Sequence, residues 1–502
     1  MSLTATKSRI WLAMVALVPA TIVVGLDITI LSVALPTLAD KLSASTAQLQ
    51  WFVMAYTITF AAAIIPSGIL SDRFGRRRVL MISLVVFGLG SLACVFSQNS
   101  GELVAARALL GVGAAGIATL SIVLVTVMFP EERRGRAMTT IIMANMVGYP
   151  LGPIFGGWLL AHVGWQWLFV INLPIVVIAL VIGRLAIPES RAETAQRLDL
   201  PGLLTVTGAV VLLCFGFTQA GSHTWSEWDT WLPIAGGAVL LIAFLAIEAR
   251  STAPMVPLSL FRRLRFTSGA LGASLLSFVV AGLLFFIPQY TQTVLGATTE
   301  QSGLYLVAFV VGMFLVSPFS GRLVRVMGGQ ATIAIGFTIG AVAMIMAVSS
   351  TVSSPGWWLV SWSLLVGIAF GLGLPTSMDL ALGDLGGEEA GVGSAVLQSL
   401  RQVSTAMGAA IIGGVLASGY RGHLHVDLPV RLQSLVHAGV VQGLAVATKL
   451  GSPDLAARVR EAFMVGMRHA SLVCAVICAI AVVVFVVLSI VARARRRVTG
   501  AG

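Results

Sequence analysis

The chain has 502 residues, of which 57% are hydrophobic and only 10% are charged. This composition excludes a soluble globular protein of the same size and indicates an integral membrane protein. The net charge of +11 does not indicate a nucleic-acid-binding protein, because most of the basic residues stand in short stretches between apolar runs.

The apolar runs are about twenty residues long, which suits helices that cross a bilayer and exceeds what barrel strands need. An even number of spans places both termini on one side, and most of the 31 Lys and Arg residues fall on that side. The positive-inside rule therefore predicts a multi-pass protein of the cytoplasmic membrane with both termini in the cytoplasm. Hydropathy predicts about fourteen spans, at 10–36, 46–70, 79–97, 102–128, 135–161, 166–187, 200–220, 230–249, 266–293, 301–325, 331–350, 356–382, 391–417 and 466–492.

The first predicted span contains one carboxylate, Asp27, within an otherwise apolar run. Asp27 lies about 13 Å of helix rise from Pro36, at the outer end of this span. Burial favours the neutral form of a carboxyl group and a nearby cation favours the anion, so an intramembrane acid can take up and release protons. We expect Asp27 to carry protons or contact substrate; the alternative is an acid that is permanently paired for helix packing.

The cytoplasmic loop after the second span has the pattern Gly-x-Leu-x-Asp-Arg-x-Gly-Arg-Arg. The first glycine allows helices to approach closely, the acid can cap a helix or pair with arginine, and the basic residues can bridge to acids on a facing helix end. We expect this loop to form a cytoplasmic gate, although a cluster that only sets the topology would look similar. The gate residues are Gly68, Asp72, Arg73, Gly75, Arg76 and Arg77.

A weaker copy of this pattern follows the tenth span, where Gly321 and Gly328 have the same spacing as the first pair of glycines and Arg325 takes the place of the acid. The separation of the copies indicates a repeat of six spans with two further spans inserted between the halves. The predicted domains are a six-helix bundle, an inserted helix pair, and a second six-helix bundle with an outer loop at 418–465; their ranges are 1–190, 191–255 and 256–502.

The fourth span contains Arg107, which lies about 9 Å below the outer surface, at a depth similar to that of Asp27. We expect the two side chains to pair, so that separating them couples protonation to conformation. The alternative is that Arg107 extends to the outer headgroups.

The fifth span has a smooth face of glycines and two prolines that bend it. A bent helix with such a face suits sliding during alternating access. The residues of this pattern are Gly148, Gly152, Pro153, Gly156 and Gly157.

Together these motifs resemble the fourteen-span drug:proton antiporters of the major facilitator superfamily. The loop at 68–77 resembles the superfamily's loop signature, Arg-x3-Gly-x-Gly from Arg107 resembles its fourth-span signature, and Gly-x3-Gly-Pro-x2-Gly-Gly from Gly148 resembles the antiporter signature. The resemblance implies an all-α major facilitator fold, with two six-helix bundles plus two inserted helices. It also implies proton-coupled export of lipophilic or cationic small molecules by alternating access, with Asp27 as the proton carrier and Arg107 as its partner. Ser32 departs from the family, which usually has Asn there.

The substrate cavity is less well defined by sequence. We expect Arg401 first of all to hold Asp379, and otherwise to attract an anionic group or contact another helix. All cavity candidates could also be packing residues or face lipid. They are Tyr56, Asn145, Tyr149, Phe286, Gln289, Asp379 and Arg401.

Two other functions fit the sequence less well: a proton symporter or facilitator for a small nutrient or metabolite, and a non-transporting membrane receptor. No phosphate-binding Gly-x4-Gly-Lys-Ser/Thr loop occurs, and no enzymatic function is expected. Cys474 and Cys478 stand one helical turn apart, which favours packing over a metal site. The expected partners are a small-molecule substrate and the lipid bilayer, not nucleic acid; protons are the only coupling ion expected, no other cofactor is expected, and the chain is expected to be monomeric.

Overall fold

The structure is a computed structural model that describes residues 7–192, 199–222, 227–251 and 254–499. Within these ranges the chain is helical and contains no strand, and fourteen of its helical segments are long and apolar enough to cross a membrane. The expected all-α architecture with fourteen spans is therefore confirmed. The helices are α1 (Lys7–Lys41), α2 (Thr46–Phe74), α3 (Arg76–Phe96), α4 (Ser100–Met128), α5 (Glu131–His162), α6 (Trp167–Val170), α7 (Asn172–Ala186), α8 (Leu200–Ser222), α9 (Trp228–Arg250), η1 (Leu258–Arg262), α10 (Leu264–Gln289), η2 (Tyr290–Val294), α11 (Thr299–Met327), α12 (Gly329–Val348), α13 (Gly356–Leu382), α14 (Gly387–His423), α15 (Val430–Ala438), α16 (Val440–Lys449) and α17 (Pro453–Thr499).

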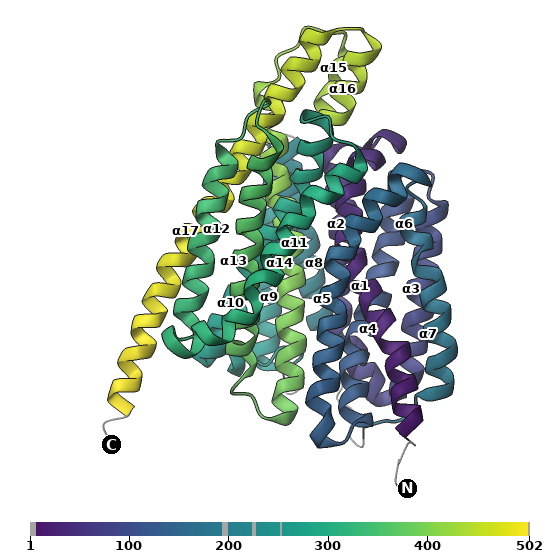
Figure 1. Cartoon of the computed structure of the whole chain (residues 1–502), viewed down its shortest axis with the longest axis vertical. Coiled ribbons are helices and arrows are strands. Elements are labelled where there is room, and N and C mark those ends of the chain that lie inside the picture. The colour runs from purple at the N-terminus through teal and green to yellow at the C-terminus, as the bar shows by residue number, and fades with distance from the viewer. Residues whose placement is uncertain (1–6, 193–198, 223–226, 252–253, 500–502) are drawn as a thin grey trace.

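The helices stand side by side, with both chain ends on one side of the bundle and α15 and α16 on the other (Figure 1). We call these the terminal side and the cap side. In the first half, α1 packs against α5 and α7, α4 packs against α2 and α3, and α3 packs against α7. In the second half, α10 packs against α14 and α17, α13 against α11 and α12, and α12 against α17. The second half thus repeats the packing of the first.

The two halves meet along two seams, α5 with α11 and α2 with α14. At the cap side, Gln50 of α2 donates to the backbone oxygens of Ala409 and Ala410, both at 3.0 Å. Gln292 of η2 donates to the Val33 oxygen of α1 at 2.9 Å. These hydrogen bonds hold the halves together toward the cap side.

Ion pairs at the terminal side have a different arrangement. Arg263 pairs with Glu389 at 2.9 Å, and Arg265 pairs with Asp384 at 2.9 Å. Each of these pairs joins segments of the second half only. The described ion pairs at this side therefore brace single halves, whereas the hydrogen bonds at the cap side cross between them.

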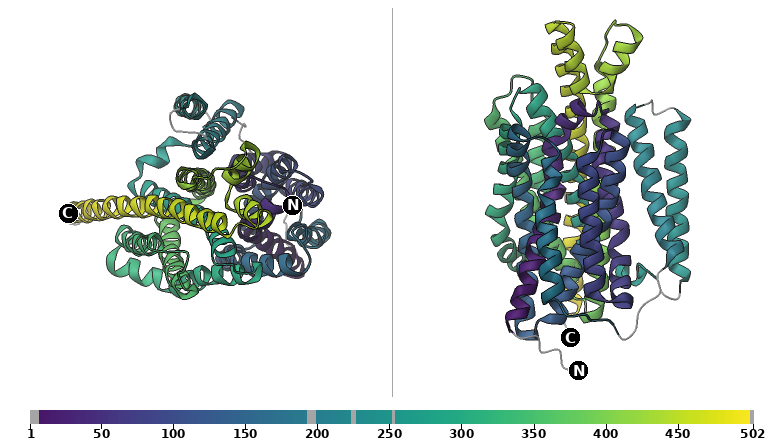
Figure 2. Two further views of the ribbon diagram at one scale, coloured as in Figure 1. Left: turned by 90° about the horizontal axis from the view of Figure 1, so that it is seen from above. Right: turned by 90° about the vertical axis from the view of Figure 1, so that its right-hand side faces the viewer.

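The inserted helices α8 and α9 flank the seam between α2 and α14 rather than separating the halves (Figure 2). α8 packs against both seam helices, and α9 packs on α8. A Cβ atom on Gly221 of α8 would lie only 2.7 Å from Cα of Gly414 on α14, so these two helices are in close contact. The Trp51 ring of α2 lies 6.4 Å from the Phe215 ring of α8. One inserted helix therefore touches both halves.

The expected outer loop at 418–465 is largely helical. It contains the end of α14, the short helices α15 and α16, and the first turns of α17, which begins well before the predicted span at 466. Thr46 of α2 donates to the Ala438 oxygen at 3.1 Å, and Tyr420 of α14 donates to the Val436 oxygen at 2.8 Å. This cap therefore contacts helices of both halves.

Candidate functional site

Asp27 of α1 and Arg107 of α4 form a buried ion pair. Arg107 Nη1 lies 2.6 Å from Asp27 Oδ2, and the two residues are 2% and 0% exposed. The pair expected from their depths is therefore present, and Arg107 does not extend to the membrane surface. A buried ion pair offsets a large desolvation cost only with additional hydrogen bonds, so the surrounding groups determine how firmly it is held.

Arg107 is held by two further contacts with α2. Its Nε donates to the backbone oxygen of Phe52 at 3.1 Å, and its guanidinium lies 4.5 Å from the centre of the Tyr56 ring. Gly111, one turn further along α4, has no room for a Cβ atom because the Tyr56 backbone oxygen occupies that space. The Arg-x3-Gly pattern thus combines the cation with the small residue that brings α4 against α2.

Sequence reasoning missed a third polar residue of this cluster, Asn172 at the start of α7. Asn172 is fully buried, donates through Nδ2 to Ser91 Oγ at 3.0 Å, and lies close enough to the Asp27 carboxylate to interact with it. Among the described residues, Asp27 Oδ1 and Asn172 Oδ1 both lack a hydrogen-bond donor. A proton on Asp27 supplies the kind of donor that this cluster lacks. An asparagine inside the apolar sixth span is the signal that could have identified it.

The predicted gate loop is built around a helix cap. Gly75 has a φ angle of +110°, a conformation that favours glycine, and a Cβ atom there would lie 2.5 Å from Glu189 Oε1. The Glu189 carboxylate accepts the backbone N–H groups of Arg77 at 3.1 Å and Arg78 at 3.2 Å. Glu189, which follows α7, therefore caps the first turn of α3 and ties the loop to the end of the same half.

The other gate residues have more local contacts. Arg76 pairs with Asp72 at 2.9 Å, one helical turn apart, and the exposed Arg73 lies over the Phe74 ring. The expectation that Gly68 permits a close helix approach is wrong in this structure. The nearest atom to a Cβ at Gly68 is a methyl group of Thr119 at 3.8 Å, which is an ordinary contact. A gating role for the loop stays a prediction.

Replacing Glu189 with Ala should lower the stability of the protein by about 1–2 kcal/mol, because two N–H groups of α3 lose their acceptor at a helix N-terminus. A shift in the thermal unfolding midpoint of the purified protein measures this effect. Asp384→Ala is the matched control, since Asp384 is an exposed acid at the same side whose pairing contributes little. Equal shifts for both variants would contradict the capping role.

The glycines of α5 serve two different contacts. Gly148 and Gly152 face α1, where a Cβ atom would lie 2.7 Å from Leu26 N and 2.8 Å from Ile30 N, respectively. Gly157 faces the other half, and its Cβ would lie 2.8 Å from the Thr299 oxygen at the start of α11. The pattern therefore supports close packing both within the first half and across the seam.

Pro153 and Gly156 complete this surface. The Pro153 backbone oxygen occupies the space of a Cβ atom at Gly303 of α11, so α11 also approaches α5 through a glycine. Gly156 faces Ile30, with its Cβ position 3.0 Å from Ile30 Cγ1. Sliding along this surface stays a prediction, whereas the close packing is observed.

Replacing Gly152 with Leu should prevent α1 and α5 from packing and sharply reduce the amount of folded protein, because the side chain would overlap backbone atoms. Gly321→Leu is the control, since no atom lies within 4 Å of its Cβ position. Monodispersity after extraction from the membrane measures the outcome. Similar behaviour of the two variants would show that the α1–α5 contact can adjust.

The cavity candidates are distributed over helices of both halves. Tyr56 is buried against Arg107 as described above, and Asn145 donates to the Thr21 backbone oxygen at 3.4 Å. The Tyr149 backbone oxygen accepts a hydrogen bond from Thr29 at 2.9 Å. In the second half, Phe286 and Gln289 are buried in α10, and Gln289 donates within its own helix.

The expectation that Arg401 holds Asp379 is wrong. Arg401 of α14 donates to Gln398 at 3.0 Å and to Ser277 of α10 at 3.4 Å, and it has no ion-pair partner among the described residues. Asp379 is exposed near the end of α13. α10 packs against both α13 and α14, and Arg401 is directed to α10 instead. Of the other roles considered for Arg401, the contact with another helix is the one observed.

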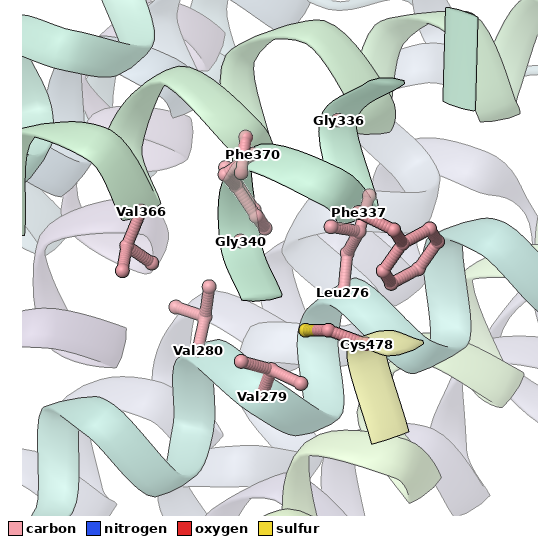
Figure 3. Close-up of a pocket in the computed structure, with 10 residues that line it drawn as sticks. Leu276, Val279, Val280, Gly336, Phe337, Gly340, Val366, Phe370 and Cys478 are labelled. Carbon is pink, nitrogen blue, oxygen red and sulfur yellow. The ribbon is translucent and has the colours of Figure 1, made fainter. Parts of the chain in front are cut away.

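The interior of the second half has an apolar gap among α10, α12, α13 and α17 (Figure 3). The gap has a volume of about 10 Å³, too small for a drug-sized substrate. The residue offset that maps Gly68 onto Gly321 also maps Asp27 onto Val280, which lines this gap together with Phe337. The two halves therefore share a packing pattern but not the polar cluster.

Comparisons with known proteins agree with this architecture. The family model described as Major Facilitator Superfamily matches residues 17–409. The tetracenomycin C resistance and export protein of Streptomyces glaucescens is 30% identical over 416 residues, covering 82% of this chain and 77% of the relative. The methyl viologen resistance protein SmvA of Salmonella typhimurium is 28% identical over 463 residues, covering 92% and 93%.

Solved structures show the same fold at lower sequence identity. A bacterial homologue of the human lysosomal transporter Spinster, in an inward-facing and unoccupied conformation, superposes with a TM-score of 0.65 at 17% identity. The match covers 96% of this chain and 98% of that chain. At this identity the likeness supports the fold alone.

Proposed function

The chain belongs to the Major Facilitator Superfamily, a family of membrane transporters rather than enzymes, and from this premise we propose that it exports lipophilic or cationic small molecules in exchange for protons. Its relatives include drug and antibiotic resistance and export proteins. The proposed substrates are therefore drugs, antibiotics or toxic metabolites.

The observation that carries this proposal is the buried pair of Asp27 and Arg107. An ionised Asp27 is stabilised by the guanidinium 2.6 Å away, whereas a protonated Asp27 no longer needs a cation beside it. A movement that separates α1 from α4 would therefore favour proton uptake, and their return would favour release. This links the protonation state to the arrangement of the helices.

The proposed orientation assigns one side of the bundle to the cytoplasm and the other to the outside. The terminal side carries most of the Lys and Arg residues and is assigned to the cytoplasm by the positive-inside rule. The cap side then faces outward, and hydrogen bonds join the two halves there. Protons that re-enter the cytoplasm drive the proposed cycle. The membrane potential contributes about 2.3 kcal/mol per charge per 100 mV to this driving force, in addition to any proton concentration gradient.

Protons are the only coupling ion in this proposal, and the transporter works as a monomer without another cofactor. Gating by the loop at 68–77 and sliding of α5 against α1 and α11 belong to the same proposed cycle. Each half would move largely as a unit, because its helices pack extensively against one another.

Transport by the purified protein in proteoliposomes tests the proposal. A proton gradient is imposed, and the movements of a fluorescent lipophilic cation and of protons are recorded together. Substrate moving against protons would support antiport. Movement of both in the same direction would replace it with a symporter, and a flux that ignores the gradient would replace it with a facilitator. If no flux appears with cationic, neutral and anionic probes, a receptor without transport activity becomes the better reading.

A further inference from the structure

A groove opens at the cap side of the seam between α5 and α11. It has a volume of about 380 Å³, within the range of small-molecule sites. It lies apart from the buried ion pair, on the outside of the bundle. The groove is lined by Ile154, Phe155 and Trp158 of α5 and by Glu300 and Leu304 of α11.

The lining combines apolar surface with a single ionisable group. Phe155 and Trp158 are 41% and 48% exposed, and Leu304 is 58% exposed. Glu300 is in the first turn of α11, and no hydrogen bond or ion pair of its carboxylate is found in the described part of the chain. Aromatic rings and a carboxylate both attract cations, while the aliphatic side chains favour a lipophilic body.

The groove spans two helices that belong to different halves. The Cβ position of Gly157 on α5 lies 3.1 Å from Cα of Glu300 on α11, so the walls of the groove are in contact at the seam. Any movement of one half relative to the other therefore changes the distance between Glu300 and the aromatic residues of α5. The affinity of the groove for a ligand would therefore depend on the conformation of the transporter.

We propose that this groove binds lipophilic cations at the cap-side face of the membrane. Charge complementarity favours a cation as the ligand. Glu300 supplies the only charge in the lining, which is negative, and the faces of the Phe155 and Trp158 rings also attract positive charge. Its role as a station for departing substrate rests on the proposed export function, whereas binding itself does not.

Protection of an engineered cysteine tests the binding. The four native cysteines are buried, so a Leu304→Cys variant in lipid nanodiscs presents a single accessible thiol in the groove. Its rate of reaction with a maleimide is measured with tetraphenylphosphonium and with tetraphenylborate, an anion of similar size. Val311→Cys is the matched control, because Val311 is exposed on the same face of α11, two turns away, and outside the groove lining.

The expected result is that tetraphenylphosphonium slows labelling of Leu304→Cys but not of Val311→Cys, and that tetraphenylborate has no effect. Adding Glu300→Gln should weaken this protection about tenfold, as expected for the loss of about 1.4 kcal/mol. Adding Asp454→Asn, which changes another exposed acid in a first helical turn, should leave it unchanged.

Equal protection by the anion, protection at Val311→Cys, or full protection with Glu300→Gln would each overturn the proposal. Protection by phosphatidylethanolamine in the nanodiscs without added cation would assign the groove to a lipid headgroup instead. The assay needs no proton gradient, and it can be repeated with Asp27→Asn. If proton-coupled export fails but the cation still protects the cysteine, the binding proposal stands and the export proposal falls. If export succeeds but the cation gives no protection, the export proposal stands and the binding proposal falls.

Discussion

Replacing Asp27 with Asn should abolish proton-coupled export while leaving the protein folded in the membrane. The amide has nearly the same shape as the carboxylate and can still accept a hydrogen bond from Arg107, but it cannot bind and release a proton. Arg107 also keeps its contacts with Phe52 and Tyr56. We expect gradient-driven transport to fall at least about a hundredfold, corresponding to roughly 2.7 kcal/mol.

The measurement is the flux of a lipophilic cation and of protons in proteoliposomes that contain equal amounts of folded protein. Asp379→Asn is the control, because Asp379 is an exposed acid near the end of α13 without a part in the buried cluster. Gradient-driven transport that persists in Asp27→Asn would remove Asp27 from the role of proton carrier. A loss in both variants would point to a general requirement for acids instead.

Replacing Arg107 with Leu should both uncouple and destabilise the transporter. The change leaves Asp27 without its cation at a site that is 0% exposed, and removing one partner of a buried pair typically costs about 3–5 kcal/mol. Binding a proton neutralises the remaining carboxyl group and removes much of that cost. The loss of stability should therefore be smaller at acidic pH and should grow as the pH rises.

Thermal unfolding of purified Arg107→Leu across a pH series measures this effect. In the double variant with Asp27→Asn the pH dependence should disappear, because no ionisable group of the pair remains. Arg401→Leu is the control, since Arg401 donates only to the neutral side chains of Gln398 and Ser277. A pH-independent loss in Arg107→Leu would show that the missing contacts with α2, rather than the unpaired Asp27, cause the destabilisation.

The ion pair illustrates how far sequence reasoning reached at the site. Depth along a helix follows from residue number, so Asp27 and Arg107 were correctly matched in height. Asn172 and Glu189 were missed, although both contact residues that the motifs identify. The direction in which Asn172 points around its helix axis, and the position of Glu189 beyond the end of α7, are set by tertiary packing. Residue number alone does not describe either of them.

Arg401 is a case in which the sequence predicts a contact that the structure does not contain. The sequence predicts Asp379 as the partner of Arg401, but α10 lies against both of the helices that carry these residues, and its Ser277 accepts a hydrogen bond from the guanidinium. A partly helical outer cap at 418–465 could be predicted, but the bounds of α15 and α16 could not, because these helices are short and their apolar residues occupy single faces. Such helices are stabilised by the surface on which they dock rather than by their own hydropathy.

The number of spans, the internal repeat and the presence of charges within the membrane could all be read from the amino-acid sequence. The bilayer constrains the chain along the membrane normal. The length, hydropathy and charge of each segment are therefore sufficient to recognise these features. The three-dimensional packing decided which polar groups meet, where the inserted helices stand and where the groove at Glu300 opens. These features depend on helix rotation and tilt, which small residues such as Gly111 and Gly152 set through close contacts between distant parts of the chain.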